Sequence, residues 1–229
     1  MIGHRFAARH KVGVVLVVGM SMLAGACTGG RDPAPEPAGT AATPKTLFVI
    51  GSSPTLGRGL EHPTRDSWPQ LVLDQAFRPG DVLYNLAIPG GYTSEARAGF
   101  DEALGAATPD VVAIWIGGRD DLEDTPIEQF RADLEALATA AGAEGADVVM
   151  ATLLAGHPSD DRDPAYNEAI RSVAAAADAS LVDLAVVDVA RIPGDDEAFL
   201  PNEAGHRTIA NEFIAAIGAT GPGTAEIAP

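Results

Sequence analysis

The stretch Val49-Ile50-Gly51-Ser52-Ser53-Pro54-Thr55-Leu56-Gly57 decides the fold of this 229-residue chain. An apolar run ends there in a turn of small residues, which predicts a buried strand followed by a tight turn. Such a turn would place a serine hydroxyl on the edge of a sheet, so Ser53 is a candidate nucleophile. The alternative is that two serines and a proline only form the turn that ends the strand.

Short apolar runs alternate with helical patterns along the rest of the chain. This alternation predicts a parallel sheet with helices on both faces. We expect five buried strands, at Thr46–Ile50, Val82–Leu86, Val111–Ile116, Val148–Leu153 and Leu181–Leu184.

Two helix boundaries can be predicted from capping signals. Thr125-Pro126-Ile127-Glu128 predicts a helix start, with threonine as the cap and proline at the first helical position. The last helix carries apolar residues at helical spacing up to Ile217 and is expected to stop at Gly218.

Three later stretches complete a pattern with the first one: Asn85-Leu86-Ala87-Ile88-Pro89-Gly90, Ile116-Gly117-Gly118-Arg119-Asp120 and Leu200-Pro201-Asn202-Glu203-Ala204-Gly205-His206. In their order and rough spacing, the four stretches resemble the sequence blocks of the SGNH/GDSL hydrolases. The resemblance spans nearly all of the expected folded region. It implies an α/β fold of three layers, flavodoxin-like, with a five-stranded parallel sheet, and a hydrolase of ester bonds that uses no cofactor.

The resemblance assigns roles to three residues that each follow a predicted strand closely. Ser53 takes the position of the nucleophile, while the aspartate before it in the family is Ser52 here. Gly90 takes the position of a backbone oxyanion donor, and Arg119 that of an asparagine donor. Because sites in open parallel sheets lie beyond the carboxyl ends of the strands, these residues are expected to meet.

Arginine at position 119 has two interpretations. A guanidinium near Ser53 would stabilise an oxyanion or lower the pKa of the serine. It would equally bind a carboxylate or phosphate group in a site that does no chemistry.

The last block departs from the family. Alignment on its Pro-Asn pair places Glu197 at the aspartate position and Leu200 at the position of the catalytic histidine. A serine hydroxyl is too weakly acidic to attack an ester at neutral pH without a base, so this change removes the usual mechanism. Glu197 is then an orphaned carboxylate at the rim, a partner of Arg119, or part of a solvated acidic loop.

Any substitute base must come from the remaining histidines. His157 is the best placed, because it follows the fourth predicted strand on the edge that carries the site. His62 lies in the loop after Ser53, and His206 begins the last helix, where the family commonly has a packing residue. No two histidines stand at ligand spacing on one element, so no metal site is predicted.

The first 27 residues resemble a bacterial lipoprotein signal peptide. Three basic residues precede an apolar run, Val12–Ala26, which is shorter than the ~20 residues of a membrane-spanning helix. The run ends at Cys27, the chain's single cysteine, which the resemblance marks for lipidation. We expect a secreted protein, lipid-anchored at the extracytoplasmic face of the cell membrane; the alternative is an ordinary signal peptide with a chance cysteine.

Composition sets the remaining boundaries. Residues 28–44 are rich in Gly, Pro, Ala and Thr and are expected to form a disordered tether. The hydrolase-like domain is expected at 45–217 and a flexible tail at 218–229. A mature chain would carry 12 basic and 32 acidic residues, a formal net charge of -20, so nucleic acid is excluded as a partner and membrane contact is expected only through the anchor.

Three hypotheses follow from these observations. In the first, the protein is a monomeric envelope lipoprotein that has lost the triad and binds a small ester, acyl or glycan ligand. In the second, it is an active, divergent esterase that uses Ser53 with a substitute base or with help from Arg119. In the third, it is a structural surface protein with a vestigial cleft.

Overall fold

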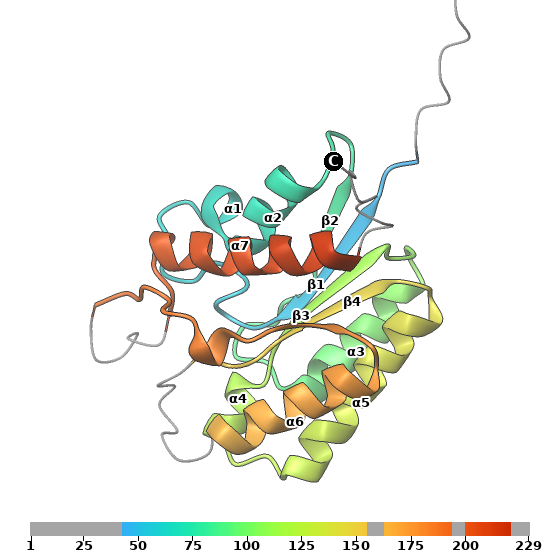
Figure 1. Cartoon of the computed structure of the whole chain (residues 1–229), viewed down its shortest axis with the longest axis vertical. Coiled ribbons are helices and arrows are strands. Elements are labelled where there is room, and N and C mark those ends of the chain that lie inside the picture. The colour runs from blue at the N-terminus through green and yellow to red at the C-terminus, as the bar shows by residue number, and fades with distance from the viewer. Residues whose placement is uncertain (1–42, 155–162, 194–199, 221–229) are drawn as a thin grey trace, which may run out of the picture. The chain divides into compact units, whose positions relative to one another are not determined.

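The computed structural model describes residues 43–154, 163–193 and 200–220, which belong to one compact unit of the chain. Strands and helices alternate through most of it (Figure 1). In chain order, the elements are β1 (Thr46–Gly51), α1 (Pro63–Asp66), α2 (Trp68–Ala76), β2 (Val82–Asn85), α3 (Thr93–Leu104), β3 (Val111–Trp115), α4 (Gly118–Leu122), α5 (Ile127–Ala143), β4 (Asp147–Ala151), α6 (Asp163–Ala176), β5 (Ser180–Val182), the 3-10 helix η1 (Leu184–Val186) and α7 (Glu203–Thr220).

The five strands form one parallel sheet in the order β2-β1-β3-β4-β5. This is the flavodoxin-like order, in which the chain reverses its direction of winding between β1 and β3. In the sheet register, Val49 pairs with Asn85 of β2 and with Ala113 of β3, so the carboxyl ends of these strands lie side by side. The predicted α/β fold with a five-stranded parallel sheet is confirmed.

Alternate side chains of β1 pack into two separate hydrophobic cores, one on each face of the sheet. Phe48 and Ile50 pack into a cluster with residues of α3, α5 and α6. Leu47 and Val49 pack into a second cluster, which contains Trp68 of α2 and residues of α7. The two helix sets cover opposite faces of the sheet (Figure 1), which explains why β1 is apolar at each position from Leu47 to Ile50.

Three strands differ clearly from their predicted form. β4 ends at Ala151, before the predicted end at Leu153. β2 and β5 are the edge strands and are not fully buried: Val82 and Tyr84 of β2 are 43% and 38% exposed, and Leu181 of β5 is 39% exposed. β5 ends at Val182, because Leu184 begins the 3-10 helix η1. An apolar run alone does not distinguish an edge strand from a central one.

Two helix boundaries were also predicted wrongly. Helix α5 begins at Ile127 with Pro126 as its cap residue, so Thr125 is not the cap. Instead, the Thr125 amide donates to the Asp120 carbonyl at 2.9 Å. Helix α7 does not stop at Gly218 but continues to Thr220.

Both cores lie entirely after residue 46. The chain from Thr43 onward therefore holds everything that the described core needs. The predicted signal peptide and almost all of the predicted tether lie outside the described residues. Among the helices that the structure describes, none is long and apolar enough to cross a membrane.

Candidate functional site

The turn after β1 presents Ser53 at the carboxyl edge of the sheet. A side chain at Gly51 would overlap that of Thr55, so the tight turn requires glycine there. The Ser53 carbonyl accepts the Arg58 amide at 3.1 Å, which closes the turn. The local sequence of small residues thus lifts the serine hydroxyl out of the strand, as predicted.

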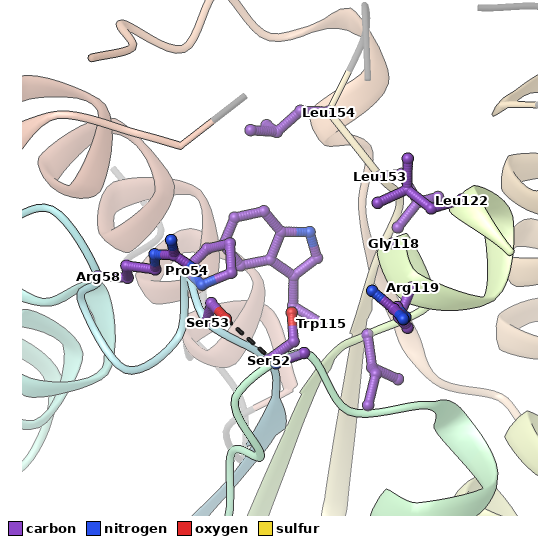
Figure 2. Close-up of a pocket in the computed structure, with 12 residues that line it drawn as sticks. Ser52, Ser53, Pro54, Arg58, Trp115, Gly118, Arg119, Leu122, Leu153 and Leu154 are labelled. Atoms are coloured by element: carbon purple, nitrogen blue, oxygen red, sulfur yellow. Dashed lines mark hydrogen bonds between the residues drawn. The ribbon is translucent and has the colours of Figure 1, made fainter. Parts of the chain in front are cut away.

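Gly90 lies next to this hydroxyl. Its amide donates to Ser53 Oγ at 3.1 Å (dashed line in Figure 2). Gly90 has a φ of 63°, which favours glycine, and its loop is held to the sheet because the Ile88 amide donates to the Gly51 carbonyl at 3.0 Å. A backbone amide aimed at the nucleophile is placed to stabilise an oxyanion that forms there.

Arg119 lies in α4, after a sharp bend at Gly117 with a φ of 118°. Its Nε donates to Tyr92 Oη at a long 3.5 Å, and its Nη2 lies 2.9 Å from Glu123. The guanidinium carbon is 5.6 Å from the centre of the Tyr92 ring, within the range of a cation–π contact. The Tyr92 hydrogen bond, followed by the charge of Glu123, raises the pKa of Arg119.

Asp120 connects α4 to the start of α3. Its buried carboxylate accepts the Thr93 amide at 2.9 Å and the Thr93 hydroxyl at 2.8 Å. Burial raises the pKa of Asp120, although the hydrogen bonds from Thr93 oppose that shift. This carboxylate fixes Arg119 relative to the loop that carries Gly90.

Ser53, Gly90 and Arg119 line one pocket, so the structure brings these three predicted residues together (Figure 2). The pocket has a volume of about 170 Å³. Its two charged residues, within the described part, are Arg58 and Arg119. The full lining is Ser52, Ser53, Pro54, Arg58, Gly90, Trp115, Ile116, Gly118, Arg119, Leu122, Leu153 and Leu154.

Neither a carboxylate nor an imidazole lines the pocket among the residues that the structure describes. Leu200, at the histidine position, is fully buried and is not part of the lining. Its carbonyl accepts the Ile192 amide at 2.9 Å. Glu197 and His157 lie outside the described residues, as does Cys27.

The two described histidines of the folded part do not line the pocket either. His62 has a side chain that is 52% exposed and lies 3.6 Å from Glu61. His206 is completely buried, and its Nδ1 accepts the Trp68 amide at 3.2 Å. Burial lowers the pKa of His206 to about 4, so it is neutral at physiological pH and serves packing, as the sequence suggested.

Sequence analysis missed Asp120 and Tyr92 as residues that position the site. Asp120 stands in the same block as Arg119, and Tyr92 and Thr93 follow the block that ends at Gly90. The available signal was an acidic residue in a strand-to-helix turn, Asp120, together with a threonine near a helix start, Thr93. The hydrogen bond between Thr93 and Asp120 joins residues 27 positions apart, so a local pattern does not reveal it. The described residues contain no group of three or more His, Cys, Asp or Glu that could hold a metal ion.

Residues 49–208 match the model of the GDSL-like Lipase/Acylhydrolase family. The chain belongs to this family. The matched range contains all four sequence blocks, and the first three of them contribute residues to the pocket lining.

Known GDSL-type proteins resemble the chain in sequence and fold. An arylesterase from Vibrio mimicus is 32% identical over 106 residues, which cover 45% of this chain and 52% of the relative. The chain thus matches about half the length of that relative. The solved structure of TesA is 24% identical with a TM-score of 0.67, and covers 76% of this chain and 99% of its own.

A second solved structure, the psychrotrophic esterase EstA from Pseudoalteromonas sp., is 21% identical with a TM-score of 0.65. It covers 76% of this chain and 97% of its own. At these identities, the two structures confirm the fold.

Proposed function

We propose that this GDSL-family protein binds a small ester or acyl group at Ser53 and hydrolyses it poorly or not at all. The observation that carries the proposal is the composition of the pocket. It holds a serine and an amide aimed at that serine, but no described acid or base that could take the hydroxyl proton.

The chemistry explains why this combination favours binding over turnover. A serine hydroxyl needs a neighbouring base to become a nucleophile, and loss of that base from a serine triad costs about 10⁶-fold in kcat. The amide of Gly90 still offers a hydrogen bond to a ligand oxygen. The apolar wall of Trp115, Leu153 and Leu154 offers burial for a hydrocarbon group.

A second candidate function is an active, divergent esterase. The contact between the Gly90 amide and Ser53 Oγ favours it, because an oxyanion donor is of use mainly in a reaction. The arylesterase relative points in the same direction. In this case a base from the segment 155–162, for which His157 is our candidate, would have to reach Ser53.

Hydrolysis of p-nitrophenyl acetate and butyrate by the chain from Thr43 onward separates these two functions. We expect rates near the uncatalysed background, with no further loss in Ser53→Ala. Ser52→Ala is the matched control, because it removes the adjacent pocket hydroxyl and leaves Ser53 in place. Turnover that Ser53→Ala abolishes and Ser52→Ala retains would establish the esterase instead, and His157→Ala would then identify its base.

Binding needs its own measurement. Ligand-detected NMR with ethyl butyrate is expected to show contact with the wild-type protein and none with Ser53→Leu, whose side chain would fill part of the pocket. Equal signals from both proteins would contradict the assignment of this pocket. Absence of any signal would favour the third hypothesis, a vestigial cleft.

We further propose that the protein is an envelope lipoprotein, anchored through Cys27 to the outer side of the cell membrane. The N-terminal basic residues, the short apolar run and the single cysteine after small residues support this proposal. Labelled palmitate supplied to a bacterium that expresses the full chain should enter the wild type but not Cys27→Ser. A wild-type chain recovered from the medium without label would contradict the anchor.

A further inference from the structure

The charges that line the pocket are opposite in sign to the charge of the whole chain. The chain contains 32 acidic and 15 basic residues. In the described part of the pocket, however, the charged lining residues are the two arginines, Arg58 and Arg119. The described lining of the pocket therefore carries positive charge on a chain that is acidic overall.

Arg119 is held by two contacts and keeps further N–H donors for a ligand. A guanidinium carries five N–H bonds. Among the described residues, Tyr92 and Glu123 take one each, through Nε and Nη2. The stacked Tyr92 ring and the short helix α4 restrict the side chain further, so less conformational entropy is lost when a ligand binds.

Figure 2 shows how the pocket separates its polar groups. Ser53 and Arg58 lie on one side and Arg119 on the other, with the indole of Trp115 between them. The volume of about 170 Å³ is close to the ~150 Å³ of a cavity that holds one benzene molecule. A ligand that fits thus has a small apolar body with polar groups at its ends.

We propose that the pocket selects small ligands that carry one carboxylate or phosphate group on an apolar body, with Arg119 as the anion-binding residue. The inference rests on the proposed function, because the ester or acyl end of the same ligand lies at Ser53. A planar guanidinium binds both carboxylates and phosphates in a bidentate geometry. The strong negative charge of the chain repels polyanions, so a single small anion is the favoured ligand.

Glu123 competes only weakly for Arg119. The side chains of this pair are 48% and 42% exposed. Exposed ion pairs contribute little, so an incoming anion displaces or shares this contact at small cost. Removal of the glutamate charge should strengthen anion binding.

Calorimetric titration of the chain from Thr43 onward, in 0.15 M salt, tests the proposal with three probes of similar shape. Benzoate and phenylphosphonate are anions, and benzamide is neutral. We expect at least one anion to bind about tenfold or more tightly than benzamide. The tighter of the two anions distinguishes a carboxylate ligand from a phosphate ligand.

Variants assign the preference to Arg119. Arg119→Gln should abolish the preference for anions, Arg119→Lys should keep part of it, and Glu123→Gln should increase it a few-fold. Arg97→Gln is the matched control, because Arg97 pairs with Asp133 away from the pocket and should leave all three affinities unchanged. A thermal melt of each variant confirms that it is folded.

The outcomes separate this inference from the proposed function. Equal binding of benzamide and the anions would overturn the anion preference and leave ester binding intact. An anion preference that survives Arg119→Gln would overturn the role of Arg119. No binding of any probe, together with no contact from ethyl butyrate, would overturn both proposals.

Discussion

The nucleophile half of the site, at Ser53 and Gly90, directs a hydroxyl and an amide into the pocket. The base half, described at residues 191–193 and 200–206, uses its side chains for packing and capping. In the nucleophile half, the Gly90 amide meets Ser53 Oγ at 3.1 Å, and the loop behind it is tied to the Gly51 carbonyl. Main-chain amides make these two contacts, and the buried carboxylate of Asp120 holds the start of the following helix through Thr93.

In the base half, the side chains serve the fold. Leu200 is fully buried. Asn202 donates to the Arg191 carbonyl at 2.9 Å and accepts the Gly205 amide at 3.0 Å, which caps the first turn of α7. Gly205 is required because a side chain there would overlap the Ala190 carbonyl.

The difference shows that the described part of the base half contributes packing and capping to the fold, whereas the nucleophile half places a hydroxyl and an amide in the pocket. The main-chain features of both halves are needed for the strand-to-helix connections, so they are retained with the fold. A catalytic imidazole is not needed for folding, and an apolar side chain at its position adds buried surface.

The largest expected effect comes from Leu200→His, which tests whether the base half lacks only an imidazole. We expect a loss of about 2–4 kcal/mol in the free energy of unfolding, because a polar ring replaces a fully buried apolar side chain. Urea denaturation measures it, with Leu200→Met as the volume-matched control at a loss below about 1.5 kcal/mol.

Ester hydrolysis by Leu200→His should remain at background, because position 200 does not line the pocket. A gain of turnover that a second change, Ser53→Ala, removes would contradict the separation of the base half from the pocket. It would mean that the side chain at position 200 reaches the serine.

Asp120→Ala tests whether the Asp120 carboxylate holds the nucleophile half through its hydrogen bonds. The change leaves the Thr93 amide and hydroxyl without their buried acceptor, and we expect a loss of about 2–3 kcal/mol in the free energy of unfolding. Asp120→Asn keeps one acceptor oxygen and should lose less. Equal stability of Asp120→Ala and the wild type in urea would show that the half is not held through this carboxylate.

His206 sharpens the comparison, because the base half has an imidazole that serves packing. Its pKa is about 4 in the folded protein, against 6.5 for the ordinary side chain. Between these two pH values the unfolded chain binds one more proton than the folded chain. Stability is therefore complete above pH 6.5 and falls by about 1.4 kcal/mol for each unit of acidification toward pH 4.

His206→Asn isolates this contribution, because its side-chain oxygen can still accept the Trp68 amide but does not titrate. Urea denaturation at several pH values between 4 and 7 should show a shallower pH dependence for this variant. Parallel curves for the two proteins would contradict the depressed pKa of His206.

Ser52→Ala should have the smallest effect. Ser52 lines the pocket beside Ser53, and its carbonyl, not its hydroxyl, makes the turn contact with the Leu56 amide at 3.2 Å. We expect a change in stability within about 0.5 kcal/mol. A thermal or urea measurement that finds a loss above about 1 kcal/mol would show that the serine hydroxyl supports the turn.

The part of the site that could be predicted from sequence is the part that main-chain geometry controls. Alternating apolar runs predicted the parallel sheet, and the turns after three strands predicted that Ser53, Gly90 and Arg119 would meet. Local sequence patterns did not predict the burial of a strand, because burial depends on the neighbouring strands and helices. β2 has the composition of a buried strand, yet it lies at the sheet edge.

The sequence by itself determined the layered fold and the position of Ser53 after the first strand, because both depend on residue order and local pattern. Only the tertiary structure decided that Leu200 and His206 are buried, that Asp120 holds the start of α3, and that the charged side chains of the described pocket lining are arginines. Burial and charge environment arise from contacts between residues far apart in the chain, which no local pattern records.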